Sequence, residues 1–351
     1  MPTPLERQRP QGRHTPHLWS VWIVAPTALA VVGMLAYGLY QGADTLLTAQ
    51  NRTGKPVDVN DVIKTTVTVL TLVGAVLTGI YAYRKQLLAE GDAHRADASQ
   101  LADRYSAAAE QLGHEQAAVR LAGVYAMARL ADDWPEQRQV CIDVLCAYLR
   151  MPYEPEHTAT GFKTGEREVR LTIIRTISDH LQDPTAPTTW CGRNLNFTGA
   201  IFDGGHFSRA HFTEGLVDFG GAQFTGDTVN FLDAKFIGGT VSFVGAQFTG
   251  DTVGFLNAQF IGGSVTFGGA QFVGDWAMFN HAQVNDGVLH FGAAKFIGGI
   301  VSFSEAQFTG GTVSFVGAQV TNATVSFGGV QVGSNANVLW GPFPVISPGT
   351  S

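Results

Sequence analysis

Few residues of this 351-residue chain have the type and spacing that enzyme chemistry needs. Asp218-Phe219-Gly220 spells the metal-binding tripeptide of protein kinases, but no glycine-rich phosphate loop or catalytic-loop motif accompanies it. Cys141 and Cys146 are five residues apart, which places them on different faces of a helix and fits no zinc-ligand spacing. We therefore interpret the tripeptide as part of a repeat and the two thiols as core side chains.

The histidines and the glycine pairs do not assemble a site either. His206, His211, His281 and His290 lack a companion carboxylate at the spacing of a metal ligand set or a catalytic triad. Glycine pairs such as Gly238-Gly239 recur at a fixed phase, which is typical of turns rather than of one phosphate-binding loop. The sequence predicts no catalytic residue, no metal ligand and no cofactor, and hence a protein that is not an enzyme.

The strongest pattern in the chain is the spacing of phenylalanine. Of the 23 phenylalanines, 21 lie between Phe197 and Phe327. One series recurs at a constant interval from Phe219 through Phe231 and Phe243 to Phe327, and a second series of Phe or Val lies five residues after each member of the first. A short fixed period of this kind is typical of a solenoid, whose units stack on their neighbours to bury their apolar faces.

Each repeat sends its apolar side chains to one side. The units read Ala-x-Phe or Val-x-Phe, and residues two apart on an extended segment point the same way. Gln, Lys, Ser, Asn and Thr occupy the outward positions, which predicts a polar exterior. The seven-residue spacing keeps this phase by adding a two-residue turn such as Gly226-Asp227.

The segment Leu195-Asn196-Phe197-Thr198-Gly199-Ala200-Ile201-Phe202 resembles the unit of the pentapeptide-repeat family, a small residue two before a central Leu or Phe. The resemblance implies a right-handed, four-sided β-helix. Here the repeat is a 12-residue variant of five plus seven residues, so a four-sided coil would take two such repeats. A coil of one repeat is the alternative, but its interior would have to hold two phenylalanines, a valine and an alanine in each layer.

Two uncharged apolar segments, residues 18–40 and 65–83, are each long enough to span a bilayer as a helix. A cleaved signal peptide is the alternative for the first segment, but a second span follows it. Six Lys or Arg flank the pair and three lie in the connecting loop, so both termini are expected in the cytoplasm. Three cysteines, an odd number, also fit no framework of an oxidised extracellular domain.

A helical period follows the second span. We predict helices over residues 86–112, 115–131, 135–150 and 166–181. The second helix is expected to bury Val119, Ala122, Tyr125 and Leu130. The fourth is expected to bury Val169, Ile173, Ile177 and Leu181.

The helical region is similar to a segment that precedes the repeats in membrane-anchored bacterial pentapeptide-repeat proteins. The similarity is carried by Asp103-Arg104-Tyr105, Glu110-Gln111-Leu112-Gly113, residues 119–126 and Arg129-Leu130-Ala131. It implies an architecture only, because that subfamily has no general assigned activity.

The expected organisation is a multidomain membrane protein with a two-helix transmembrane hairpin, a small all-α module and a β-helix. Its parts are a cytoplasmic tail (1–17), a transmembrane helix (18–40), an extracytoplasmic loop (41–64), a second transmembrane helix (65–83), the α-helical module (84–183), a linker (184–192), the pentapeptide-repeat β-helix (193–332) and a C-terminal cap or tail (333–351).

Charge bears on the partners. Residues 195–351 contain nine Asp or Glu and three Lys or Arg, a net charge of −6, which disfavours nucleic-acid binding. We predict a non-enzymatic scaffold in the cell membrane, held by the lipid bilayer through its two spans. The β-helix would present a rigid cytoplasmic face to a protein partner that the sequence does not identify, and the pattern sets no oligomeric state.

Two alternatives stay open. Some soluble pentapeptide-repeat proteins mimic duplex DNA and inhibit gyrase, so the resemblance implies, as one alternative, an inhibitor of a DNA-binding enzyme. Against it, Asp227, Asp251 and Asp275 are 24 apart and would form one column instead of two phosphate-like tracks. The other alternative is surface adhesion, which applies if the repeats lie outside the cell.

Overall fold

The computed structural model describes residues 59–346 and separate residues between 27 and 45, each of which is helical. The expected tail (1–17) lies outside the described residues, as do most of the first span (18–40) and most of the loop (41–64). The chain divides into two compact units, residues 1–96 and 97–351.

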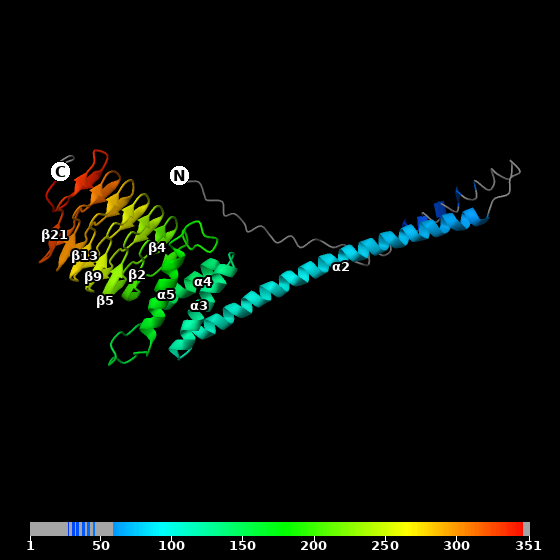
Figure 1. Cartoon of the computed structure of the whole chain (residues 1–351), viewed down its shortest axis with the longest axis horizontal. Coiled ribbons are helices and arrows are strands. Elements are labelled where there is room, and N and C mark those ends of the chain that lie inside the picture. Colours follow the sequence, from blue (N-terminus) through cyan, green and yellow to red (C-terminus); the bar gives the residue numbers. More distant parts are fainter. Residues whose placement is uncertain are drawn as a thin grey trace, which may run out of the picture. The chain divides into compact units, whose positions relative to one another are not determined.

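A single helix of 54 residues, α2 (Val59–Leu112), holds the second apolar segment (Figure 1). Residues Val67–Ala89 are long and apolar enough to cross a membrane, and they are the one candidate span among the described residues. The sequence suggested a span over 65–83 and a separate helix over 86–112. The two are continuous, because the intervening Arg84 and Lys85 are good helix formers and no proline interrupts them.

Three shorter helices follow, α3 (Ala117–Asp133), α4 (Arg138–Arg150) and α5 (Glu166–His180). All three were predicted, with starts two to three residues early for α3 and α4. The buried face of α5 is confirmed, since Val169, Ile173, Ile177 and Leu181 are at most 2 % exposed.

The predicted buried face of α3 is wrong except at Leu130. Tyr125 is 55 % exposed, Ala122 is exposed and Val119 is only half-buried. The face that packs inward runs through Arg120, Gly123, Val124, Met127, Ala128 and Ala131. The stripe begins with a buried arginine. A prediction from the spacing of apolar residues does not count a charged residue as buried, so it assigned the inward face to the wrong side of the helix.

Residues from Leu195 onward form a β-solenoid with four sides, which we number 1 to 4 in chain order. Side 1 consists of β1 (Leu195–Asn196), β4 (Leu216–Asp218), β7 (Thr240–Ser242), β11 (Ser264–Thr266), β15 (Val288–His290), β19 (Thr312–Ser314) and β23 (Asn337–Leu339). Side 2 consists of the first halves of β2 (Ile201–His206) and β5 (Gln223–Asn230), then β8 (Gln247–Phe248), β12 (Gln271–Phe272), β16 (Lys295–Phe296) and β20 (Gln319–Val320).

Side 3 begins with the second halves of β2 and β5, which join sides 2 and 3 into one sheet. It continues with β9 (Thr252–Gly254), β13 (Trp276–Met278), β17 (Ile300–Ser302) and β21 (Thr324–Ser326). Side 4 consists of β3 (His211–Phe212), β6 (Lys235–Phe236), β10 (Gln259–Phe260), β14 (Gln283–Val284), β18 (Gln307–Phe308) and β22 (Gln331–Val332).

Strands of successive coils pair in parallel, and over most of the rod the paired residues are offset by two of the five-plus-seven repeats. Val241 pairs with Val265, and Phe236 pairs with Phe260. The first coil is shorter, since Leu195 pairs with Val217, because three five-residue units precede the first seven-residue unit. The sequence favoured a coil of two repeats over a coil of one, and these registers confirm it.

Phenylalanine columns fill the interior of the solenoid. Phe231, Phe255 and Phe279 stack with ring centroids 4.8 Å apart and planes within 1°. A second column through Phe243 and Phe267 meets the first edge-on, at 87°. The ring spacing equals the distance between hydrogen-bonded strands, so each coil places its rings directly on those of the coil before it.

A left-handed residue closes each corner two positions after a first-series phenylalanine, and likewise the corners after Phe197 and Phe207. Glycine fills many of these corners, as Gly221 does with φ 62°, but Arg209, Asp233, Asn257, His281, Ala293 and Glu305 also adopt φ of 55–60°. A left-handed conformation costs a non-glycine residue roughly 1–2 kcal/mol. The solenoid core therefore imposes its corner geometry on residues that do not favour it.

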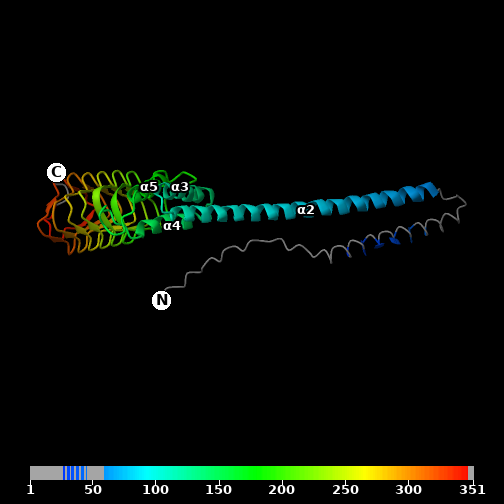
Figure 2. The ribbon, with the colours of Figure 1, turned by 90° about the horizontal axis from the view of Figure 1, so that it is seen from below.

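The apolar core is covered at both ends of the solenoid. At the first coil, Ile174 of α5 packs so closely on Gly205 that a Cβ there would lie 3.0 Å from Ile174 Cγ2. At the last coil, Trp340 is buried and stacks on Phe315, and Phe343 lies 5.1 Å from Phe327. Figures 1 and 2 show the three short helices gathered at the β2 end of the solenoid. The helices α3–α5 and the solenoid thus share one continuous core.

Candidate functional site

The motifs singled out in the sequence have structural roles. Asp218 faces outward and caps its own turn, with its Oδ1 accepting a 2.8 Å hydrogen bond from the Gly220 N–H. Cys141 and Cys146 are fully buried free thiols, and burial raises their pKa values to about 11 and about 12. Both motifs therefore belong to the repeat and the core, as the sequence suggested.

The histidines are dispersed. His206 and His281 are exposed, whereas His211 and His290 are half-buried. His290 Nδ1 accepts a 3.2 Å hydrogen bond from the Gly292 N–H, and His211 Nδ1 is buried. Within residues 59–346 and the described positions before them, no group of three or more His, Cys, Asp or Glu could hold a metal ion.

Buried charges join the helices to one another and to the first coil. Arg120 pairs with Glu166 at 3.2 Å, and the Tyr148 hydroxyl donates to the same carboxylate at 3.0 Å. Burial and the neighbouring Glu166 raise the pKa of Tyr148, so its hydroxyl stays a donor. Arg170 donates to the Leu149 and Ile201 carbonyls, which ties α5 to both α4 and β2.

Asp203 of β2 makes a second link between the helical region and the first coil. Its Oδ2 accepts from Arg167 Nε at 3.0 Å and from the Tyr153 hydroxyl at 3.1 Å. Burial and the Asp203 charge raise the pKa of Tyr153 to about 12. The orientation of α5 over the first coil is therefore fixed by ionic contacts as well as by the apolar contact at Gly205.

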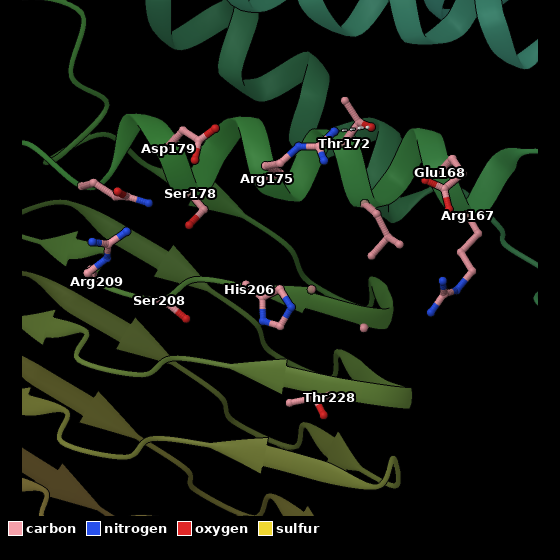
Figure 3. A pocket seen from close by; sticks show the side chains of 14 residues that line it. Arg167, Glu168, Thr172, Arg175, Ser178, Asp179, His206, Ser208, Arg209 and Thr228 are labelled. Carbon is pink, nitrogen blue, oxygen red and sulfur yellow. Dashed lines mark hydrogen bonds between the residues drawn. The ribbon is translucent and has the colours of Figure 1, made fainter.

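A polar cleft of about 620 Å³ lies between α5 and the first two coils. One wall is a stripe of α5 that includes Arg167, Glu168, Thr172, Arg175, Ser178 and Asp179, with Gln182 just after the helix. The opposite wall is formed by Gly204, Gly205, His206, Ser208, Arg209 and Thr228. Figure 3 shows Arg175 on the helix and His206 on the strand, on opposite sides of the opening. The volume is within the range of ordinary ligand sites, but this lining is more polar than most.

Three arginines and one histidine line the cleft against two carboxylates. Arg167 is engaged by Asp203, and Arg175 donates to Thr172 Oγ1 at 3.2 Å. Arg209 is exposed, and no hydrogen bond or ion pair of its side chain occurs within the described part of the chain. The solenoid as a whole carries a net negative charge, whereas basic side chains outnumber acidic ones in the lining of this cleft.

The strand at the cleft has an open edge. In each later coil, the carbonyl that corresponds to His206 accepts a hydrogen bond from the coil before it, as Asn230 O does from Phe207 N at 2.6 Å. The same holds for the carbonyl that corresponds to Ser208, since Leu232 O accepts from Arg209 N at 2.7 Å. No coil precedes the first, and no donor from residues 59–346 reaches His206 O or Ser208 O.

The coverage of this edge stops on both sides of the cleft. Arg170 Nη2 donates to Ile201 O at 3.1 Å, and Leu181 O accepts from His211 N at 2.7 Å. The helices therefore complete the hydrogen bonding of the first coil at those two places and leave the stretch between Gly205 and His211 open. A strand edge of this kind can pair with another extended chain.

Sequence reasoning did not find this cleft. Its helix wall and its strand wall are separate segments of the sequence, and only the packing of α5 on β2 brings them together. One local signal was present, because Arg209 occupies the corner position that is glycine in Gly199 and Gly221.

Comparison with known proteins addresses the solenoid. A family model described as pentapeptide repeats (9 copies) matches residues 197–241. None of the curated proteins and none of the solved structures compared with the chain matches it. With the four-sided coils described above, this match identifies pentapeptide repeats in the first part of the β-solenoid.

Proposed function

We propose that this protein is a non-enzymatic scaffold, anchored in a membrane, that presents its β-solenoid for protein–protein interaction. The observation that carries the proposal is the continuous phenylalanine core, which holds four sides of short, mainly polar side chains in fixed positions. A rigid surface loses little conformational entropy when a partner docks. Among its described residues, the solenoid brings together no set of titratable groups of the kind that catalysis uses.

Membrane anchoring is part of the proposal. Its support is the apolar stretch Val67–Ala89, whose side chains include Leu70, Leu72 and Tyr81, all more than 60 % exposed. Such a surface is costly in water and favourable in hydrocarbon. The two-span hairpin with both termini and the solenoid in the cytoplasm remains our proposal from the distribution of Lys and Arg.

The acidic side chains give little support to the DNA-mimic alternative. Asp251 and Asp275 share the corner between sides 2 and 3, where Trp276 N donates to Asp251 O. Asp218 lies on side 1, and Asp286 lies at the corner before side 1. Among the described residues these carboxylates occupy separate columns, which is unlike two parallel rows of phosphates.

Photo-crosslinking from each side tests the scaffold proposal. A photoreactive amino acid replaces Leu216, Gln247, Trp276 or Gln307, which are exposed and lie on sides 1, 2, 3 and 4. We expect adducts of discrete mass from one or two sides in intact cells, because a specific partner covers a defined part of the surface. Equal adducts from all four sides, or none from any, would contradict a docking role for the solenoid.

Cysteine labelling tests the orientation. We expect a membrane-impermeant maleimide to label Thr53→Cys in intact cells and Gln307→Cys only after permeabilisation. Only Cys191 needs prior replacement, by serine, because Cys141 and Cys146 are buried and their raised pKa values disfavour the reactive thiolate. The reverse labelling pattern would place the solenoid outside the cell and favour adhesion.

A further inference from the structure

We propose that the cleft between α5 and the first coil binds an extended peptide segment of a protein partner, with an acidic side chain near the segment's centre. The proposal rests on the proposed scaffold function and assigns it a site. The segment would pair with the open strand edge at His206 and Ser208 and would lie under the arginines of α5.

The backbone supplies the first part of the argument. The backbone groups of residues 205 and 207 point toward β5, as the hydrogen bond from Phe207 N to Asn230 O shows. The N–H and C=O of His206 therefore point away from β5, toward the cleft, as does Ser208 C=O. A peptide that adds as a strand satisfies such groups with its own backbone, which gives affinity without dependence on its sequence.

The dimensions of the cleft supply the second part. On α5 its wall runs from Arg167 to Asp179, which is about 18 Å at 1.5 Å per residue. The open strand edge comprises residues 206–210, so an extended segment of about five residues covers it at roughly 3.3 Å per residue. Along α5, Arg167 and Arg175 are separated by about 12 Å, so the bases do not converge on one point. This spread favours an elongated ligand over a single small anion.

The charges of the cleft supply the third part. Arg175 lies between Glu168 and Asp179 along α5, on the opposite side of the opening from His206 (Figure 3). Its Nη2 donates to Thr172 Oγ1 at 3.2 Å and to the Tyr125 hydroxyl at 3.5 Å. A carboxylate at the centre of the peptide would meet Arg175, whereas an ammonium there would be repelled. Hydroxyls of Ser208 and Thr228 line the strand wall beside it. Arg209 adds a base at a corner where glycine would be less strained.

Selection of peptides on the intact protein tests this proposal. Full-length protein in detergent micelles is offered a phage-displayed library of random nonapeptides, and an enriched peptide is synthesised and its Kd measured by fluorescence anisotropy. We expect enriched sequences with a central Asp or Glu and without central proline. N-methylation of alternate peptide amides should weaken binding at least tenfold in one register and have little effect in the other.

Two cleft variants and a matched control accompany the peptide. Arg175→Glu should weaken binding at least tenfold, and Arg209→Gly should weaken it severalfold. Because glycine favours the φ of 60° at this corner, Arg209→Gly should leave the Tm unchanged or raise it, so lost binding cannot be ascribed to unfolding. Glu305→Gly relieves the same conformation (φ 59°) four coils away and should not change the Kd.

Three outcomes would overturn the proposal. They are the absence of any enriched peptide, equal affinity of the enriched peptide for Arg175→Glu and the unchanged protein, and equal tolerance of both N-methylation registers. None of them removes the scaffold function, which the side-specific crosslinks test separately. Conversely, peptide binding at the cleft with no crosslinked partner from any side would support the site and contradict docking on the solenoid faces.

Discussion

Replacing Phe255 by aspartate is expected to unfold the solenoid around the third coil. Phe255 is fully buried, lies 4.8 Å from Phe231 and from Phe279, and meets Phe243 and Phe267 edge-on. Loss of a buried phenylalanine costs roughly 3–5 kcal/mol, and a carboxylate in its place adds the cost of an unpaired buried charge. We expect a total above about 5 kcal/mol, measured as a large fall in Tm by circular dichroism.

The matched control lies four residues further along the same coil. Gln259 belongs to β10, is half-buried and points outward between Lys235 and Gln283. Gln259→Asp introduces the same side chain at a solvated position and should change stability by less than about 1 kcal/mol. Equal losses for the two variants would mean that the inward and outward phases have been assigned to the wrong residues.

The inward and outward positions of the solenoid and the length of its coil could be predicted, because every repeat carries the same pattern. Val241, Phe243, Ala246 and Phe248 are all buried, as the two-residue periodicity requires, and the same pattern recurs in the next coil. Each repeat also carries its own turn residues. A solenoid is a nearest-neighbour structure, so a pattern in the sequence translates almost directly into contacts between successive coils.

The helical region and the cleft were less predictable, because their contacts connect residues that are distant in sequence. The inward face of α3 was misassigned because Arg120 begins it, and Arg120 is buried only because Glu166 of α5 meets it there. Gly123 gave no signal either. A Cβ on it would lie 2.7 Å from the Leu112 N, so the glycine marks a close approach of α3 to the end of α2.

The same reasoning explains why the cleft was missed. Arg167 and Arg175 are unremarkable surface residues on α5, and the open edge exists only because the first coil has no predecessor. Neither property is visible in a periodic pattern. The repeat does not specify the structure at the ends of a solenoid. At the first coil, contacts with the helices determine which backbone groups are hydrogen-bonded.

Replacing Arg120 by alanine is expected to destabilise the helical region strongly. The pair that it forms with Glu166 is almost completely buried, with side-chain exposures of 4 % and 11 %. Arg120 also donates to His114 O at 2.9 Å. Removing one member of a buried ion pair costs roughly 3–5 kcal/mol, because the other charge is left in a site of low polarity. The measurement is the free energy of unfolding from urea titration followed by circular dichroism.

An exposed ion pair in the same region provides the control. Arg104 and Asp133 approach to 2.7 Å, closer than Arg120 and Glu166, but their side chains are 39 % and 46 % exposed. Arg104→Ala should therefore cost less than about 1 kcal/mol. The double variant Arg120→Met/Glu166→Leu should recover most of the loss, because no charge is left unpaired. If Arg120→Ala cost no more than Arg104→Ala, the Arg120–Glu166 contact would not hold α3 against α5, and the packing of these two helices would have to depend on their other contacts.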